Sequence, residues 1–207
     1  MSKNEKNSLI LSDPQRIFLN QHFKGLDLSK QEIHAKEFDN CHFIDCNFTE
    51  ANFKKCKFSE CLFKNCNLSM IKVNGCSFFD VIFEDSKAIG VNWTMANWPT
   101  IKLSAPVKFY KCILNDSSFL GLSLSEMIMT ECKAHDVDFR EADCAQADFS
   151  YTDFTNSLFN KTNLTEANFA EATHYNIDVF LNEIKRAKFS LPEAINLLNS
   201  LEIELVE

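Results

Sequence analysis

Cysteine and histidine are the residues of this 207-residue chain best suited to chemistry, because thiolates and imidazoles bind metals and take part in redox and nucleophilic reactions. The chain has no recognisable zinc-binding or nucleotide-binding motif, and its five histidines are scattered without a nucleophile and base beside them. Apart from Cys144, the cysteines in each half of the chain are separated by multiples of five residues. A structural repeat therefore explains them best, and a metal site or a redox sensor stays as the alternative.

The same five-residue period governs the phenylalanines, sixteen of which occupy one position of a repeating frame. We call this position the centre. Chance would place roughly a fifth of the phenylalanines there, so the period marks an internal repeat. The sixteen are Phe23, Phe38, Phe43, Phe48, Phe53, Phe58, Phe63, Phe78, Phe83, Phe109, Phe119, Phe139, Phe149, Phe154, Phe159 and Phe169. The cysteines two residues before a centre are Cys41, Cys46, Cys56, Cys61, Cys66, Cys76, Cys112 and Cys132.

The consensus of the repeat is a small residue, then Asp or Asn, then a Leu or Phe centre, then two polar residues. A period of five fits neither the spacing of three and four in an amphipathic helix nor the alternation of a strand. The chain must instead turn a corner every five residues and send the small residue and the centre inward each time. The cysteines are then small buried hydrophobic residues that stay thiols in a reducing compartment.

In this repeat the chain resembles the pentapeptide-repeat proteins. The resemblance implies an all-β solenoid, a right-handed quadrilateral β-helix in which four pentapeptides make one coil. About eight such coils would cover residues 21–176, each burying its centres only against the coils above and below it. We expect residues 1–20 to form an N-terminal cap.

The repeat changes phase by one residue between Leu103 and Phe109. We expect a bulge or a small outward loop at one corner, in the segment 104–108. Trp93 and Trp98 occupy adjacent centres just before it, so the core must widen or shift there.

The five-residue pattern ends after Asn176, with His174 at the last centre, and residues 177–207 follow a different pattern. Ser190 is suited to cap a short helix with Pro192 in its first turn, and the tail after Leu201 alternates like a strand. This segment either caps the open end of the solenoid or packs against its own copy in a homodimer. The residues expected in a dimer interface are Phe189, Leu191, Ala194, Ile195, Leu197, Leu198, Leu201, Ile203, Leu205 and Val206.

The C-terminal pattern brings the resemblance closer to the Qnr proteins and to the pentapeptide proteins of mycobacterial fluoroquinolone resistance and of microcin immunity. The matching segments are residues 187–189, the helix 191–201, the tail to Val206 and the repeated Cys-x-Phe units of residues 38–68. The resemblance implies a dimeric rod that binds DNA gyrase or topoisomerase IV and protects it from inhibitors such as quinolones or peptide toxins. Qnr proteins carry two projecting loops, whereas this chain has only the one-residue shift, as in the loop-free relatives.

Negative charge is concentrated in the second half of the chain. Residues 1–105 contain 13 Lys and Arg against 12 Asp and Glu, whereas residues 106–207 contain 8 against 17, a net charge of −9. The negative electrostatic field of this half disfavours nucleic-acid binding and attracts basic surfaces, so an acidic rod can imitate DNA. Each single acid can equally serve a turn or solubility. The residues expected to bind a partner are Asp116, Glu126, Glu131, Asp136, Asp138, Glu141, Asp143, Asp148, Asp153, Glu166 and Glu171.

Other classes of function receive little support from the sequence. No apolar run is long enough for a membrane span or a signal sequence, so we expect a cytoplasmic protein with no membrane partner and no direct nucleic-acid partner. We expect no enzyme activity, cofactor or metal, because no motif for them is present. The leading hypothesis is a dimeric DNA mimic that binds a type II topoisomerase. The alternative is a scaffold or regulator that binds another protein and has no topoisomerase role.

Overall fold

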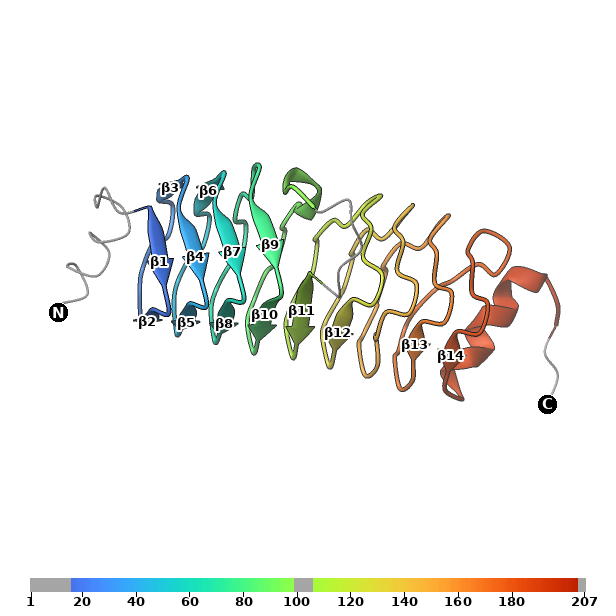
Figure 1. The fold of residues 1–207 in the computed structure, drawn as a ribbon. Coiled ribbons are helices and arrows are strands. Elements are labelled where there is room, and N and C mark those ends of the chain that lie inside the picture. The colour runs from blue at the N-terminus through green and yellow to red at the C-terminus, as the bar shows by residue number, and fades with distance from the viewer. Residues whose placement is uncertain (1–15, 99–105, 205–207) are drawn as a thin grey trace.

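The computed structural model describes residues 16–98 and 106–204, and these form an elongated rod of stacked coils (Figure 1). Apart from the 3-10 helices η1 (Trp93–Met95) and η2 (Glu193–Leu201), the regular elements of the described residues are strands of two to four residues. Every strand pair is parallel. The expected all-β solenoid of about eight coils is thus confirmed.

Each coil has four faces, because residues twenty positions apart pair in register and each pentapeptide contributes one face. We number the faces by their first centres: face 1 begins at Phe18, face 2 at Phe23, face 3 at Leu28 and face 4 at Ile33. Face 1 carries β1 (Ile17–Leu19), β4 (Glu37–Asp39), β7 (Lys57–Ser59) and β9 (Ser77–Phe79). Face 2 carries β2 (His22–Lys24), β5 (His42–Ile44), β8 (Leu62–Lys64), β10 (Val81–Glu84), β11 (Val107–Tyr110), β12 (Ile128–Thr130), β13 (Asn168–Phe169) and β14 (Lys188–Phe189). Face 4 carries β3 (Glu32–His34) and β6 (Asn52–Lys54), and face 3 is held by isolated bridges such as Asp27 to Asn47.

The corners between faces lie two residues after each centre and adopt left-handed backbone conformations. A residue with a side chain pays roughly 1–2 kcal/mol for this conformation, whereas glycine does not. All four glycines of the chain stand at such corners, and the other corners are mainly Asn, Asp, Glu and Lys. The polar end of each pentapeptide is therefore the part that turns the chain.

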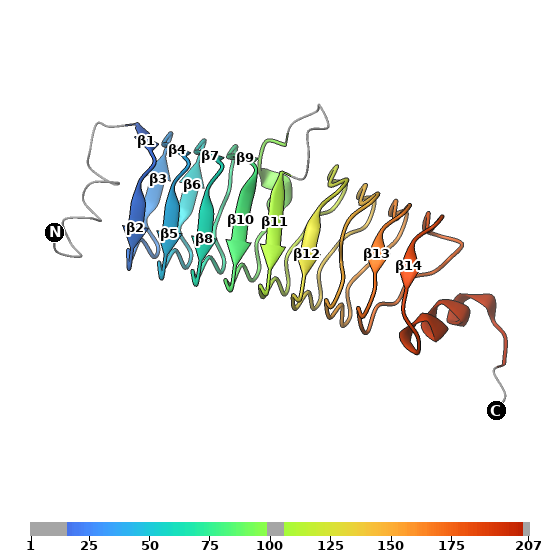
Figure 2. The ribbon, with the colours of Figure 1, turned by 60° about the horizontal axis from the view of Figure 1, so that its bottom comes forward.

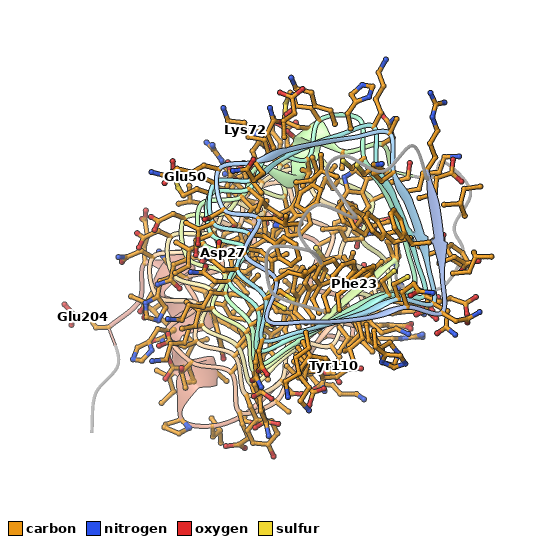
Figure 3. All side chains as sticks on the ribbon, turned by 90° about the vertical axis from the view of Figure 1, so that its left-hand side faces the viewer. Phe23, Asp27, Glu50, Lys72, Tyr110 and Glu204 are labelled. Atoms are coloured by element: carbon orange, nitrogen blue, oxygen red, sulfur yellow. The ribbon has the colours of Figure 1, made fainter. Side chains whose placement is uncertain are left out.

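Where successive coils have aromatic centres, the rings stack in parallel inside the rod. On face 1 the ring centroids of Phe38 and Phe58 are 5.2 Å apart with an interplanar angle of 10°, and on face 4 those of Phe139 and Phe159 are also 5.2 Å apart. Viewed along the rod, Phe23 lies inside the coil, whereas Glu50 and Lys72 point away from it (Figure 3). Each ring is buried by the coils above and below, as expected for a one-dimensional stack.

One coil contains six more residues than the others. Val81 of β10 pairs with Val107 of β11, twenty-six positions on, and Phe83 stacks on Phe109 with centroids 4.9 Å apart. The phase change of one residue at 104–108 therefore belongs to an insertion of six residues, because a five-residue frame cannot register an added whole pentapeptide. Trp98 stacks on Phe78 and occupies a centre as expected, and residues 99–105 lie outside the described part of the chain.

The ladder runs past both limits, 21 and 176, that the sequence pattern suggests. β1 pairs with β4 at the first end, and β14 pairs with β13 at the second, where Phe189 stacks on Phe169. Residues 1–15 of the expected N-terminal cap lie outside the described part. The assignment of His174 to the last centre is wrong: Tyr175 is the buried residue, and His174 is exposed with φ 54°. The register changes at this point, because Asp153 pairs with Thr173 twenty positions on, whereas Phe159 pairs with Ile177 only eighteen positions on.

The C-terminal helix η2 lies across the end of the rod (Figures 1 and 2). Its N-cap is Pro192, without a side-chain cap bond, so the expected capping role of Ser190 is wrong. The Ser190 hydroxyl instead accepts a hydrogen bond from the N–H of Glu171 in the last coil. Residues 202–204 form no strand, and the remaining tail, with Leu205 and Val206, lies outside the described part.

Candidate acidic interaction surface

The eleven acids expected to bind a partner fall into two structural classes. Four stand just before a centre, and the other seven stand at corners or share the corner conformation. The first class is Asp138, Asp143, Asp148 and Asp153, which lie on faces 4, 1, 2 and 3 in that order. The second class is Asp116, Glu126, Glu131, Asp136, Glu141, Glu166 and Glu171.

The four aspartates before centres are half-buried and are held by hydrogen bonds within the rod. Each carboxylate accepts the backbone N–H two residues further on, the bond that closes an Asx turn. Asp143 and Asp148 also accept amide N–H groups of Asn163 and Asn168 from the next coil, both at 2.9 Å. Hydrogen bonds from Arg140 lower the pKa of Asp138. These four carboxylates stabilise the turns and the ladder, so they are less available to a partner than the seven corner acids.

Asp153 accepts hydrogen bonds from two histidines. The distances are 2.8 Å to Nε2 of His135 and 2.9 Å to Nδ1 of His174. Burial raises the pKa of Asp153, but hydrogen bonds from Thr155, His135 and His174 outweigh it, so the net effect is a pKa well below the usual range. The cluster joins three successive coils on face 3 and was not apparent from the sequence, because the phase change that turns His174 outward hides it.

The seven corner acids project from the edges of the rod. Three have basic partners: Glu131 with Lys111 at 3.6 Å, Glu141 with Lys161 at 4.0 Å, and Glu166 with Arg186 at 3.4 Å. Such exposed pairs contribute little stability. The described residues offer no ion-pair partner to the other four, all of which are exposed. They are Asp116, Glu126, Asp136 and Glu171.

Asp116 and Asp136 occupy the same corner in successive coils, since the N–H of Asp116 donates to the carbonyl of His135 in the coil above. Parallel strands are about 4.8 Å apart, so these two carboxylates repeat along one edge of the rod at about that distance. Like charges so close repel each other, and a basic ligand relieves that repulsion.

The nine cysteines are buried free thiols, and the eight that stand two residues before a centre donate hydrogen bonds inside the rod. Cys66 Sγ donates to the carbonyl of Phe43, twenty-three residues earlier, and Ser86 and Thr152 make the same type of bond to Phe63 and Met129. Burial raises the pKa of the Cys132 and Cys144 thiols. Among the described residues no group of three or more His, Cys, Asp or Glu side chains could hold a metal ion. No described helix is long and apolar enough to cross a membrane.

Helix η2 closes the last coil with polar side chains. The carboxylate of Glu193 accepts the N–H of His174 on face 3, and the hydroxyl of Ser200 accepts the N–H of Val179 on face 4. Together with the Ser190 contact, these bonds replace the carbonyl groups that a further coil would supply. The helix therefore caps the rod, one of the two roles expected of this segment.

Some of the residues expected in a dimer interface are used by this cap and are buried or half-buried, whereas others remain exposed. Phe189 belongs to the ring stack of face 2, and Leu197 packs against the core. Ala194 and Leu198 are half-buried. The exposed apolar residues at this end are Leu191, Ile195, Leu201 and Ile203, with Leu191 79% and Ile195 45% exposed.

Solved structures share this fold. A trypsin-treated variant of QnrB1, described as a plasmid-mediated fluoroquinolone resistance protein, is 21% identical, with a TM-score of 0.61 over 92% of each chain. Full-length QnrB1 is 15% identical, with a TM-score of 0.53 over 90% of this chain and 100% of the other. HetL from the cyanobacterium Nostoc is 17% identical, with a TM-score of 0.39 over 84% of this chain and 83% of HetL. At these identities the likeness to QnrB1 concerns the fold alone.

The sequence itself gives the family. No curated protein sequence matches the chain. The family model for the pentapeptide repeat region matches residues 36–106 and 100–169, more than half of the chain. The chain therefore belongs to the pentapeptide-repeat proteins.

Proposed function

We propose that this protein binds a type II topoisomerase, DNA gyrase or topoisomerase IV, by presenting its corner carboxylates where the enzyme holds DNA. Binding would modulate the enzyme or protect it from inhibitors such as quinolones or peptide toxins. One observation carries the proposal: the exposed corner acids of the second half repeat along the edges of a narrow rod, and four of them have no ion pair among the described residues. The fold shared with QnrB1, described as a fluoroquinolone resistance protein, supports the choice of partner.

Electrostatics favours a basic, DNA-binding surface over DNA itself as the partner. The segment from residue 106 carries a net charge of −9. B-DNA presents one phosphate per roughly 1.7 Å of its axis, so the rod is a weaker polyanion than the duplex it would replace. The attraction should therefore fall steeply with added salt.

A homodimer through the C-terminal end would double the length of acidic rod that one complex offers. The exposed apolar residues on and around η2 support such an interface, since isolated domains rarely expose clustered large apolar side chains without a partner. In this arrangement η2 would cap its own coil with polar side chains and meet its copy with apolar ones.

A supercoiling assay with purified gyrase, with and without a quinolone, tests the proposal. Wild-type protein at micromolar concentration is expected to change supercoiling activity or quinolone sensitivity. The variant Asp116→Asn, Glu126→Gln, Asp136→Asn, Glu171→Gln should need about tenfold more protein, because it loses four charges that face the enzyme. Its fold should persist, since Asn156 and Gln146 occupy equivalent corners.

The matched control removes four corner acids from the other half of the rod. It carries Glu50→Gln, Glu60→Gln, Asp80→Asn and Asp85→Asn, and should act like the wild type. If wild-type protein leaves both activity and quinolone sensitivity unchanged, the topoisomerase proposal fails. Equal losses in the two variants would mean that total charge matters and the proposed surface does not.

A further inference from the structure

We propose that a groove on face 4, near the C-terminal end, binds an extended segment of a partner protein that carries apolar and basic side chains. The groove has a volume of about 660 Å³. Its apolar lining is Leu120, Leu158 and Phe159, and its polar lining includes Arg140 and Asp178. Of the seven corner carboxylates only Glu141 lines this groove, and none of the four without an ion pair among the described residues does, so this proposal does not depend on the topoisomerase proposal.

The groove exists because the hydrogen-bond ladder of face 4 is interrupted there. Asp138 pairs with Leu158, twenty positions on, but Phe159 bridges to Ile177, only eighteen positions on. Asp153 on face 3 still pairs with Thr173, twenty positions on, so two residues are lost in the stretch where Tyr175 replaces His174 as the buried residue. The spacing of twenty returns on face 1, where Asn163 pairs with Glu183. Face 4 of this coil is therefore out of register by two residues.

The interruption leaves backbone groups without partners. Elsewhere on face 4 the N–H of a centre donates to the coil above, as Phe139 does to Leu158. The hydrogen bonds of the described residues include none from the N–H of Phe159 and none to the carbonyl of Ser157. The N–H of Phe159 and the carbonyl of Ser157 can therefore pair with the backbone of an extended peptide in the groove, beside the Phe159–Ile177 bridge.

Apolar side chains surround these free backbone groups. Leu120 is 40% exposed, Leu158 48% and Phe180 73%. Phe180 and Leu181 line a second hollow of about 310 Å³ on the following segment of the chain. Exposed apolar groups beside backbone groups without hydrogen bonds are typical of a docking site, because apolar side chains of a bound peptide can be buried against them.

The charges at the rim favour a basic guest. Arg140 is neutralised by Asp138, with nitrogen–oxygen distances of 2.9 and 2.8 Å. Glu141 and Asp178 also line the groove, and the only ion pair of Glu141 among the described residues is the 4.0 Å contact with Lys161. A lysine or arginine at either end of the guest strand would meet a carboxylate.

Binding of a synthetic peptide to the full chain tests this proposal. The probe is a fluorescent, capped peptide of alternating Val and Leu with Lys at both ends, and fluorescence anisotropy measures its affinity. Saturable binding is expected, and Leu158→Asp should weaken it by about tenfold or more. Leu158→Asp should fold, because Asp138 holds the same position one coil earlier, and Leu120→Asn is a second variant with Asn160 as its precedent. Leu19→Asp, which alters an exposed leucine on face 1, is the control and should bind like the wild type.

Two altered peptides separate the contribution of the terminal charges from that of the backbone hydrogen bonds. A peptide with Glu in place of Lys should bind more weakly, and one with N-methylated backbone nitrogens should lose its binding, since it cannot donate a hydrogen bond to the carbonyl of Ser157. The proposal is overturned if Leu158→Asp leaves peptide affinity unchanged, or if the N-methylated peptide binds equally well. It is also overturned if sedimentation shows that a second copy of the chain fills the groove, with self-association abolished by Leu158→Asp.

Discussion

At the residue scale, the inward small position selects for a side chain that is compact, mostly apolar and able to donate one hydrogen bond. Cysteine meets all three requirements, and Ser86 and Thr152 show that a hydroxyl can take its place. The thiol must keep its proton to donate to a backbone carbonyl. Cysteine here is therefore a structural donor, and its abundance needs no redox or metal chemistry.

The thiols of the native protein should accordingly be unreactive. Burial, which raises the pKa of Cys132 and Cys144, suppresses the thiolate that reacts. We expect Ellman's reagent to modify no thiol of the native protein at pH 8 on the timescale of minutes, and all nine in concentrated guanidinium chloride. Rapid reaction of any thiol in the native state would contradict the assignment.

The carboxylate of Asp153 should make stability depend on acid pH. Its pKa in the folded protein lies below the unfolded value of about 3.9, so its contribution is complete above that pH and is lost as the pH falls toward the folded pKa. Urea unfolding measured from neutral pH down to pH 3 should show a smaller acid loss for Asp153→Asn than for the wild type. Parallel curves for the two proteins would refute the role of the His135–Asp153–His174 cluster.

At the element scale, the corner is the unit that decides which substitutions the rod accepts. Its left-handed conformation tolerates Asn and Asp, accepts Glu and Lys at a modest cost, and excludes β-branched residues. The same geometry that turns the chain also projects the corner side chain outward. Fold and candidate surface thus share the same positions, which is why carboxylates can be exchanged there for amides but not for any residue.

A pair of substitutions at one corner tests this tolerance. Asp136→Asn should leave the free energy of unfolding nearly unchanged, whereas Asp136→Val should lower it by about 1–2 kcal/mol, because valine is strained at the φ of 55° found there. Urea denaturation of both variants measures the difference. Equal stability of the two would mean that the corner relaxes to another conformation.

At the scale of the whole molecule, the charged second half and the apolar C-terminal end lie together at one end of the rod (Figure 2). A dimer through that end would bring the two acidic halves next to each other. The two apolar residues of η2 best placed for such contact are Ile195 and Leu201, both exposed.

Sedimentation of wild type and Ile195→Asp tests the dimer. The wild type should sediment at twice the chain mass, and the variant should shift toward the monomer, since a carboxylate cannot be buried unpaired in an apolar interface. The η2 cap should survive, because Ile195 is on its exposed side. A wild type that is monomeric at all concentrations would leave the segment with its capping role alone.

The five-residue frame was enough to predict the solenoid, its faces and the inward direction of the centres. It failed where the chain departs from five: the frame reported a six-residue insertion as one, and it placed His174 where Tyr175 lies. The positions of the acids were predictable, but which of them stabilise turns and which are exposed to solvent was not. Whether Asp148 serves a turn or faces solvent depends on partners in the next coil, such as Asn168, that lie twenty residues away.

The side chains that close the last coil also give the rod a fixed length. Every coil presents the same set of backbone N–H donors to the next coil, so the interior of the stack does not determine how many coils form. Ser190, Glu193 and Ser200 supply that end by occupying donors that would otherwise recruit another strand. Duplicating twenty residues in the middle should therefore lengthen the rod by about 4.8 Å and leave both ends as they are. Because the cap fixes the end, the length of the rod is set by the number of coils and can change by one coil at a time.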